Sequence, residues 1–144
     1  MIYIVTALIW EARAFIDNYG LKLDNSLPHF QVYSGENINL VVSGVGKMNS
    51  AIATTYILSQ LDNMNKISAV NIGLCGSRDK GIKIGEPLLI NKIVDGDTAY
   101  EYYPDILFSH QFKESDIATL NKVVHDDNGL KINEKCVDME ISGF

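Results

Sequence analysis

Runs of apolar, β-rich residues alternate along the chain with stretches whose apolar side chains recur at helical spacing. Residues 2–9 are nearly all apolar, which predicts a strand buried on both faces, as in a parallel sheet. Residues 11–19 predict a short helix, which ends at Gly20. Two short apolar segments, 30–34 and 38–43, are separated by three residues, a spacing typical of a β-hairpin. The N-terminal part of the chain therefore predicts a strand, a helix and a hairpin.

The rest of the chain continues this alternation. A helix is predicted over 48–62, a buried strand over 67–72 and an apolar strand over 87–94. A further helix is predicted over 114–124 and a last strand over 136–140. On the helix over 48–62, the residues expected to share one face are Met48, Ile52, Thr55 and Leu58. Alternating strands and helices favour an α/β fold with a mostly parallel sheet. The length of 144 residues suits one domain that spans 1–144.

The carboxyl ends of the predicted strands carry the residues of chemical interest. In open α/β sheets ligands bind at these ends, because the loops that follow parallel strands meet at one edge. The loops concerned contain Glu11, Gly44 with Gly46, Gly73 with Gly76, and Met139 with Glu140. We therefore expect these residues to converge on one site.

The composition is that of an acidic globular protein. Hydrophobic residues make up 47% and charged residues 21% of the chain, which argues against disorder. The formal net charge of −6 disfavours a nucleic-acid partner. The apolar N-terminus is interrupted at Glu11 and resembles neither a membrane span nor a signal peptide. We expect a soluble, cytoplasmic protein with no membrane partner, in which Cys75 is a buried free thiol.

The spacing of histidine and cysteine argues against a metal site. His29, His110 and His125 lie in dispersed loop-like segments without HxxxH or HxxE spacing, so we expect them to be surface histidines. Cys75 and Cys136 form neither a CxxC pair nor a zinc pattern. The chain also contains no GxSxG elbow and no P-loop. We expect no metal and no cofactor.

Each candidate feature also has an ordinary structural interpretation. The glycines of 43–47 and 73–76 serve tight turns as readily as they allow contact with a ligand. Glu11 either stabilises the dipole of its helix or takes a proton from a water nucleophile. Glu140 is either a solvated surface acid or an acceptor for a pair of sugar hydroxyls, with Met139 as an apolar floor. Taken singly, none of these features decides between its two interpretations.

The candidate features belong to five segments that occur in order along nearly the whole chain, Val5–Glu11, Ser43–Ala51, Asn71–Gly76, Lys83–Glu86 and Val137–Glu140. Together they resemble the 5′-methylthioadenosine/S-adenosylhomocysteine nucleosidases, a family within the purine nucleoside phosphorylase superfamily. The first segment resembles that family's opening strand and first acid. The others are similar to its Ser-Gly-x-Gly-Lys turn, Asn-Thr-Gly-x-Ala-Gly loop, Lys-x-Gly-Asp entry and Val-(Glu/Asp)-Met-Glu signature.

The resemblance implies an α/β three-layer sandwich with a mixed, mostly parallel central sheet, and an enzyme that hydrolyses the N-glycosidic bond of a purine nucleoside. By this resemblance Glu11 activates the attacking water, Glu140 binds ribose hydroxyls and Met139 packs under the sugar. The backbone of Cys75–Gly76 lies near the base. Leu74 stands where the family has a small or hydroxyl residue, so contacts near the ribose differ. A carboxylate beside the ribose would stabilise the positive charge of the transition state.

Two alternatives to hydrolysis stay open. Related phosphorylases bind phosphate through arginines, and one of these stands at the position of Asn71. Asn71 offers phosphate no charged fork, and neither Arg13 nor Arg78 matches a phosphate position, which favours water as the nucleophile. Beyond the position of Phe144 the family continues into a helix, a strand and an aspartate that protonates purine N7. The second alternative is therefore a catalytically weak purine-nucleoside binding module.

The expected partner is a small purine nucleoside, with phosphate as a co-substrate only in the phosphorylase alternative. The family resemblance implies a role in methionine salvage. A C-terminally short chain would leave apolar surface exposed, so we also expect a homodimer or higher homo-oligomer.

Overall fold

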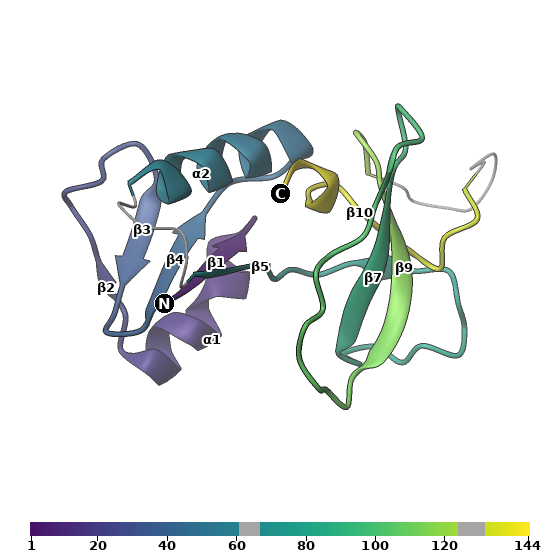
Figure 1. Ribbon diagram of the computed structural model, residues 1–144, viewed down its shortest axis with the longest axis horizontal. Coiled ribbons are helices and arrows are strands. Elements are labelled where there is room, and N and C mark those ends of the chain that lie inside the picture. Colours follow the sequence, from purple (N-terminus) through teal and green to yellow (C-terminus); the bar gives the residue numbers. More distant parts are fainter. Residues whose placement is uncertain (61–66, 124–131) are drawn as a thin grey trace. The chain divides into compact units, whose positions relative to one another are not determined.

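A computed structural model describes residues 1–60, 67–123 and 132–144, and these form two compact units (Figure 1). Unit 1 contains Met1–Leu74 together with Gly143–Phe144, and unit 2 contains Cys75–Ser142. Each unit has its own five-stranded sheet and its own hydrophobic core. The candidate site residues are therefore positioned by two separate sheets.

The sheet of unit 1 has the strand order β2-β3-β4-β1-β5. β1 runs parallel to β4 and β5, whereas β3 is antiparallel to β4 and to β2. The predicted strand, helix and hairpin of the N-terminal part are confirmed, but the strand predicted over 2–9 ends at Thr6 and Ile9 already belongs to the helix. The elements in chain order are β1 (Ile2–Thr6), α1 (Ile9–Tyr19), β2 (Lys22–Leu23), β3 (Gln31–Ser34), β4 (Ile38–Val42), α2 (Lys47–Ser59) and β5 (Ser68–Asn71).

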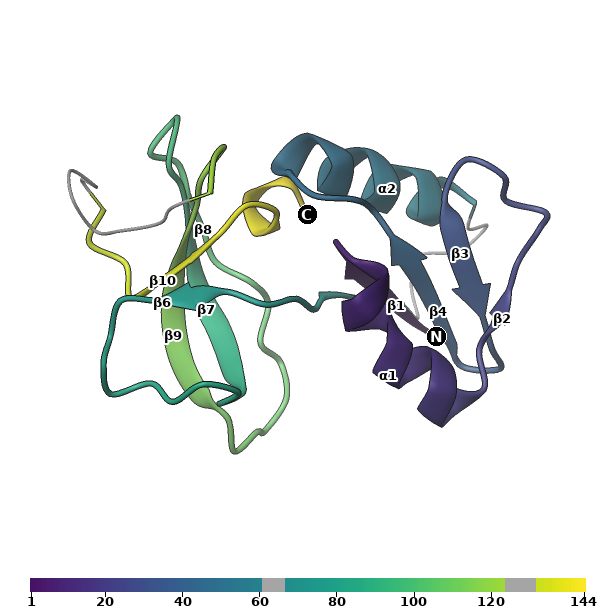
Figure 2. The same cartoon turned by 180° about the vertical axis from the view of Figure 1, so that it is seen from behind.

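Unit 1 is a three-layer α/β/α arrangement, with α1 against one face of the sheet and α2 against the other (Figure 1, Figure 2). The two layers follow from the alternation of side chains along β1. Val5 packs with Ala53 and Ile57 of α2. Ile4, on the opposite face, packs with Ala12 of α1. Because both faces of β1 are covered, its sequence is a continuous apolar run.

α2 buries a different face from the one that the sequence predicted. Met48 and Ile52 are 74% and 53% exposed, Thr55 is exposed and Leu58 is only partly buried. The buried residues of α2 are Ser50, Ala53, Thr54 and Ile57. This face has the helical i, i+3, i+4, i+7 spacing and consists mainly of small side chains, so it fits closely against the sheet. The predicted end of this helix, at residue 62, lies outside the described residues.

β5 occupies the predicted position but is not buried, contrary to the sequence prediction. Ser68, Ala69 and Val70 are all exposed. The reason is that β5 is the last strand of its sheet in the described part of the chain, with β1 as its neighbour. An apolar sequence indicates that a segment tends to pair as a strand, but the position of that strand in the sheet decides how deeply its side chains are buried.

The sheet of unit 2 has the order β6-β10-β9-β7-β8. Its three inner strands run parallel to one another, and β6 and β8 pair antiparallel at the two sides. The strands predicted over 87–94 and 136–140 are confirmed as β7 and β10. The elements are β6 (Gly76–Ser77), β7 (Leu88–Asp95), β8 (Glu101–Tyr102), β9 (Lys113–Thr119), β10 (Cys136–Asp138) and the 3₁₀ turn η2 (Ile141–Gly143).

β9 stands where the sequence predicted a helix over 114–124, and that prediction is wrong for the described residues. Within β9, Ile117 pairs with Ile93 of β7 on one side and with Cys136 of β10 on the other. These three buried residues form the core of unit 2. The helical spacing of the apolar residues is real, but pairing on both sides of the segment outweighs it. Val124 lies outside the described residues.

The predicted α/β class with mixed, largely parallel strand pairing is confirmed. Within residues 1–60, 67–123 and 132–144, no helix combines the length and the apolar character that crossing a membrane requires.

The burial of α2 predicts unequal effects for two matched isoleucine substitutions. Ile57 is 3% exposed and packs against the sheet, whereas Ile52 is 53% exposed. Ile57→Ala should lower the free energy of unfolding by about 2–5 kcal/mol, because it leaves a cavity in the core. Ile52→Ala should change it by about 0.5 kcal/mol or less. Urea unfolding of both variants measures the difference, and a larger loss for Ile52→Ala would contradict the face assigned to α2.

Candidate active site

The loops that follow β1, β4 and β5 meet at one edge of the unit 1 sheet. Parallel strands bring their carboxyl ends together, and backbone hydrogen bonds tie these loops to one another. The N–H groups of Ser43 and Gly44 donate to the carbonyls of Thr6 and Ala7 at 2.8 and 3.1 Å. On the other side, the N–H of Ile72 donates to the carbonyl of Val5 at 3.0 Å. The sequence prediction that these strand ends converge is thus met within unit 1.

The carboxylate of Glu11 lies at this edge and binds two of the loops. Its Oε2 accepts hydrogen bonds from the N–H groups of Ala7 and Leu8 at 3.0 and 2.9 Å. Its Oε1 accepts one from the N–H of Leu74 at 2.9 Å, beyond the end of β5. Glu11 is the third residue of α1, and its bond to Leu8 caps that helix. Glu11 therefore has the structural role predicted for it, at the N-terminus of its helix.

The hydrogen bonds described for Glu11 do not use the whole acceptor capacity of its carboxylate. An ionised carboxylate has about four acceptor positions, and the described residues fill three of them with N–H donors. The remaining position is on Oε1. Gly73 lies beside it, where a Cβ would come within 3.3 Å of Oε1. Because Gly73 has no side chain, this residue does not crowd Oε1. The three hydrogen bonds hold the carboxylate in one orientation.

The segment 43–47 has the conformation of a tight turn. Gly44 and Gly46 have φ of +86° and +102°, which residues with side chains rarely adopt, and Gly46 is the N-cap of α2. The hydroxyl of Ser43 donates to the carbonyl of Thr6 at 3.1 Å. The turn therefore accounts for both glycines without a ligand, and contact with a ligand stays a prediction.

Met139 and Glu140 directly follow β10 in unit 2 and are half buried. The turn that carries them is folded onto the carboxylate of Asp138. Its Oδ2 accepts hydrogen bonds from the N–H groups of Glu140 and Ile141 at 3.1 and 2.7 Å. The N–H of Met139 donates to Oε2 of Glu140 at 3.2 Å. These bonds fix the backbone from which both predicted ligand-binding side chains project.

The pKa of Asp138 is raised above its usual value, and burial is the main cause. The nearby charge of Glu140 acts in the same direction, while the hydrogen bonds from Thr119, Ile141 and Glu140 act against it. Asp138 is thus a carboxylate for which ionisation is costly and whose hydrogen bonds offset part of that cost.

Leu74 belongs to unit 1, and Cys75 and Gly76 are the first residues of unit 2. Gly76 pairs with Val137 of β10, so this loop runs beside the strand that precedes Met139. Leu74 is 81% exposed. Cys75 is also exposed, and the prediction that it is buried is wrong, because the chain leaves the unit 1 sheet at Asn71, before it reaches Cys75. Cys136 is the buried cysteine.

The thiol of Cys75 is not activated. Its partial desolvation, together with the neighbouring Cys136 and Asp138, raises its pKa to about 12. The thiol is therefore neutral at physiological pH and is a poor nucleophile.

The histidines differ in their surroundings. His29 is exposed, as predicted, and its ring meets that of Tyr56 edge-on at 5.6 Å. The side chain of His110 is only 13% exposed, so the prediction of a surface position is wrong for this residue. Its ring lies beside those of Phe108 and Phe112. Its Nε2 is 3.5 Å from a carboxylate oxygen of Glu114. His125 lies outside the described residues. The described part of the chain contains no group of three or more potential metal ligands.

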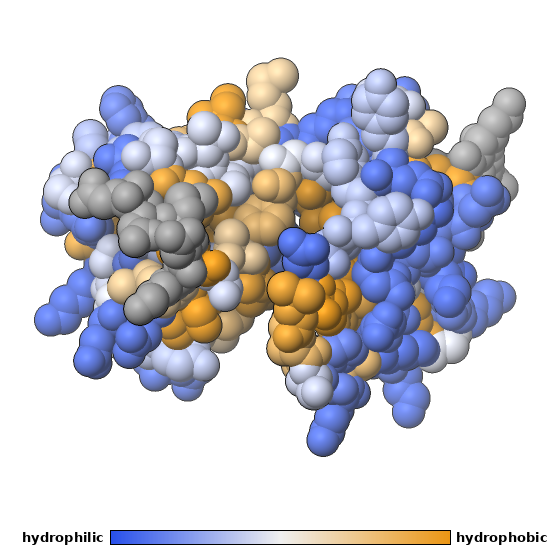
Figure 3. Space-filling view, in the orientation of Figure 1, coloured by the Kyte–Doolittle hydropathy of each residue, from blue (hydrophilic) through white to orange (hydrophobic). Residues whose placement is uncertain are grey.

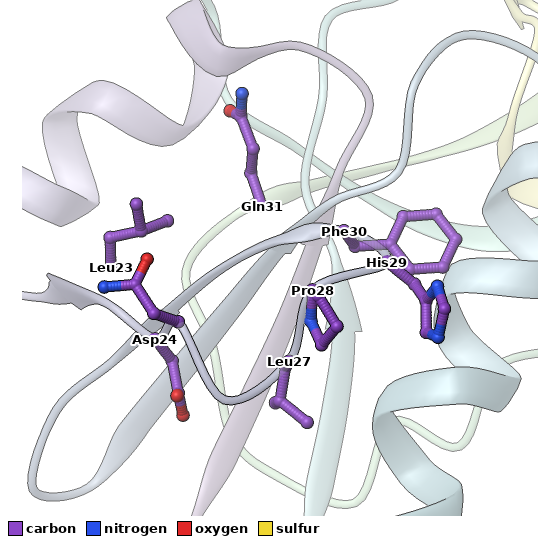
Figure 4. Close-up of a pocket in the computed structure, with 8 residues that line it drawn as sticks. Leu23, Asp24, Leu27, Pro28, His29, Phe30 and Gln31 are labelled. Carbon is purple, nitrogen blue, oxygen red and sulfur yellow. The ribbon is translucent and has the colours of Figure 1, made fainter.

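A pocket of about 370 Å³ lies in unit 1, and Glu11 is not among the residues that line it (Figure 4). Its lining comes from the single segment Leu23–Gln31. Asp24 is the acid there, and it accepts hydrogen bonds from the N–H and hydroxyl of Ser26. These bonds lower the pKa of Asp24 and belong to the turn itself. The pocket therefore brings together no reactive groups from different elements.

The sequence analysis missed the polar residues that support Met139 and Glu140. They are Asp95, Thr119, Asp138 and Ser142. Asp95, Thr119 and Asp138 each end a parallel strand. Their position at strand ends was the signal available, but Thr119 was hidden inside the helix predicted over 114–124.

The chain matches the family model described as the phosphorylase superfamily over residues 2–141. A 5′-methylthioadenosine/S-adenosylhomocysteine nucleosidase from Staphylococcus haemolyticus is 31% identical over 109 residues, which cover 71% of this chain and 46% of the relative. The nucleosidase of that name from Staphylococcus epidermidis is 29% identical over 126 residues, covering 82% and 54%. The chain thus spans about half the length of these relatives.

Solved structures share the fold. The Neisseria meningitidis nucleosidase in complex with methylthio-immucillin-A has a TM-score of 0.82 at 20% identity, covering 99% of this chain and 76% of that one. The Streptococcus pyogenes S-adenosylhomocysteine nucleosidase in complex with 5-methylthiotubericidin has a TM-score of 0.83 at 19% identity, covering 99% and 74%.

The raised pKa of Asp138 predicts a pH dependence of stability. The folded chain retains a proton at pH values where the unfolded chain has lost it, so the contribution of Asp138 to the free energy of unfolding is complete below its usual pKa. It is lost as the pH rises above about 4 and through the raised value. Wild type should therefore lose stability relative to Asp138→Asn over this range, measured by urea unfolding. Asp105→Asn, at an exposed position, should keep the wild-type profile. Parallel profiles for wild type and Asp138→Asn would contradict the shift.

Proposed function

The chain belongs to the phosphorylase superfamily, and on this premise we propose that it acts in hydrolysis of the N-glycosidic bond of a purine nucleoside related to methylthioadenosine or S-adenosylhomocysteine. The relatives named above are nucleosidases for these compounds, and two solved neighbours are complexes with analogues of such nucleosides. We also propose that residues 1–144 act together as one nucleosidase-like domain.

The observation that carries the proposal is the fixed carboxylate of Glu11. It lies at the carboxyl edge of a parallel sheet, where α/β proteins bind their ligands, and three backbone N–H groups hold it in place. Its remaining acceptor position suits a water molecule. In the proposed reaction Glu11 accepts a proton from this water as the water attacks the anomeric carbon of the ribose.

The second part of the proposal assigns the ribose to Met139 and Glu140. Cleavage of a glycosidic bond places positive charge on the sugar in the transition state. A carboxylate that accepts hydrogen bonds from the ribose hydroxyls stabilises this charge as well as binding the substrate. The proposed place of the base is along the backbone of Cys75–Gly76, with Leu74 near the sugar.

The surroundings of the two arginines favour water over phosphate. Asn71, at the end of β5, carries an uncharged amide. The guanidinium of Arg13 lies 5.1 Å from the ring centre of Trp10. The Nη1 of Arg78 donates to the carbonyl of Ile132 at 2.6 Å. A phosphorylase needs cationic groups that converge on its phosphate, whereas each arginine here lies against a different part of the chain.

Three further features belong to the same proposal. We propose a role in methionine salvage and a cytoplasmic location. Both units expose large apolar side chains, and hydrophobic residues are visible on the face drawn in Figure 3. Trp10, Met48 and Leu107 are 72%, 74% and 91% exposed. Apolar surface of this kind supports a homodimer or higher homo-oligomer.

The test is release of adenine from methylthioadenosine by the 144-residue chain, with and without inorganic phosphate, beside calorimetric binding of the same nucleoside. Release that does not depend on phosphate supports hydrolysis, and release that requires phosphate identifies a phosphorylase. Binding without release selects the alternative of a binding module. Absence of both binding and release would contradict the proposal.

Glu11→Gln should lower the turnover of methylthioadenosine about 10²–10⁴-fold, because the amide cannot take the proton of the water. Nucleoside affinity should change much less. Glu36→Gln replaces an exposed acid in the hairpin of unit 1 and should behave as wild type. Steady-state kinetics with binding measured in parallel separates the two quantities. Turnover of Glu11→Gln within threefold of wild type would remove Glu11 from this role.

Glu140→Gln should weaken the binding of adenosine about tenfold or more, since a charged acceptor for ribose hydroxyls is lost. Free adenine has no ribose, so its affinity should change much less. Isothermal titration of both ligands, again with Glu36→Gln as the control, measures the difference. Equal losses for adenine and adenosine would show that Glu140 does not face the sugar.

A further inference from the structure

The parallel strands of unit 2 end together in a polar cluster. Asp95 is the last residue of β7, Thr119 of β9 and Asp138 of β10. The strand register places Thr119 opposite Asp95 on one side and opposite Asp138 on the other. The central residue of the cluster is therefore Thr119, which is fully buried.

The hydroxyl of Thr119 makes two hydrogen bonds with different partners. It donates to Oδ1 of Asp138 at 2.8 Å. It accepts a hydrogen bond from the N–H of Ser142 at 3.0 Å. A single hydroxyl thus connects the carboxylate before Met139 and Glu140 with the backbone that follows them.

The rest of the cluster closes the turn on both sides. Oδ2 of Asp138 accepts from the N–H groups of Glu140 and Ile141 at 3.1 and 2.7 Å. Oδ2 of Asp95 accepts from the hydroxyl of Ser142 at 2.9 Å. The four-residue turn from Met139 to Ser142 is therefore bound at its start through Asp138 and at its end through Thr119 and Asp95.

We propose that Thr119 is a positioning residue for substrate recognition, and that its hydroxyl fixes the turn that presents Met139 and Glu140 to the ribose of a purine nucleoside. This inference rests on the function proposed for Glu140. Thr119 does not itself contact the substrate. It acts by orienting Asp138 and the N–H of Ser142, and so limits the conformations from which the Glu140 carboxylate projects.

The two hydrogen bonds at position 119 require a hydroxyl group, and a side chain with only the shape of threonine cannot make them. Valine has nearly the shape of threonine but neither donates nor accepts a hydrogen bond. At position 119 it would leave an oxygen of Asp138 and the N–H of Ser142 without the partner they have now. Buried groups without partners are costly, so the turn would rearrange to reach water.

The test compares Thr119→Val with Thr119→Ser, which keeps the hydroxyl. Affinities for adenosine and free adenine are measured by isothermal titration of the 144-residue chain. Thr119→Val should weaken adenosine binding about tenfold while adenine affinity stays within about twofold. Thr119→Ser should restore adenosine binding to within about threefold of wild type. A purely structural role would lower both affinities together, so equal losses would overturn the proposal, as would unchanged binding of both ligands by Thr119→Val.

A second readout does not depend on the proposed function. Amide hydrogen exchange measured by NMR should be about tenfold or more faster at Glu140, Ile141 and Ser142 in Thr119→Val than in wild type, with Ala12 in α1 unchanged. If wild type binds neither ligand, the proposed function fails, and unchanged exchange at these amides would separately refute the role of Thr119.

If Thr119→Val does not fold, Ser142→Ala removes the bond to Asp95 alone. It should then give a smaller loss, about threefold and confined to adenosine; no loss in that variant would overturn the proposal.

Discussion

The backbone N–H groups that follow parallel strands impose the main constraint on this structure. Beyond the last paired residue of a strand, the sheet provides acceptors for only some of these groups, such as the N–H groups of Ser43 and Ile72. A backbone donor without a partner is costly wherever water is excluded. Carboxylates supply the acceptors in both units. Glu11 accepts three such bonds in unit 1, and Asp138 accepts two in unit 2. The same residues therefore determine the shape of the loops and the place of the negative charges.

The two units provide acceptors for these backbone N–H groups in different ways. In unit 1 the carboxylate of Glu11 accepts hydrogen bonds from the loops and also keeps an acceptor position for a further donor. In unit 2 the tasks are divided, because Asp138 and Thr119 hold the turn while Glu140 is carried on it. A carboxylate fixed in advance can stabilise a developing charge without the cost of reorganising at the moment of reaction. This is the physical link between the fold and the proposed chemistry.

Much of the fold could be predicted from local patterns, and the errors have a common cause. The strand at the start of the apolar run over 2–9 and the hairpin within 30–43 were correct, because their signals are local in the sequence. The burial of α2 and the strand β9 were not, because each depends on residues far away in the chain. The partial burial of His110 was also missed, although the contacts described for it are with the nearby Phe108, Phe112 and Glu114. For β9 the deciding partners are Ile93 and Cys136, both some twenty residues away.

The sequence by itself determined the order of most elements, the loops in which Glu11 and Glu140 lie, and the family to which the chain belongs. These features depend on residue type and spacing, which are properties of the chain alone. The tertiary structure decided which face of α2 is buried, that Cys75 is exposed, and that Thr119 lies between Asp95 and Asp138. Pairing between strands and burial are properties of several segments at once, so periodicity within any one segment could not specify them.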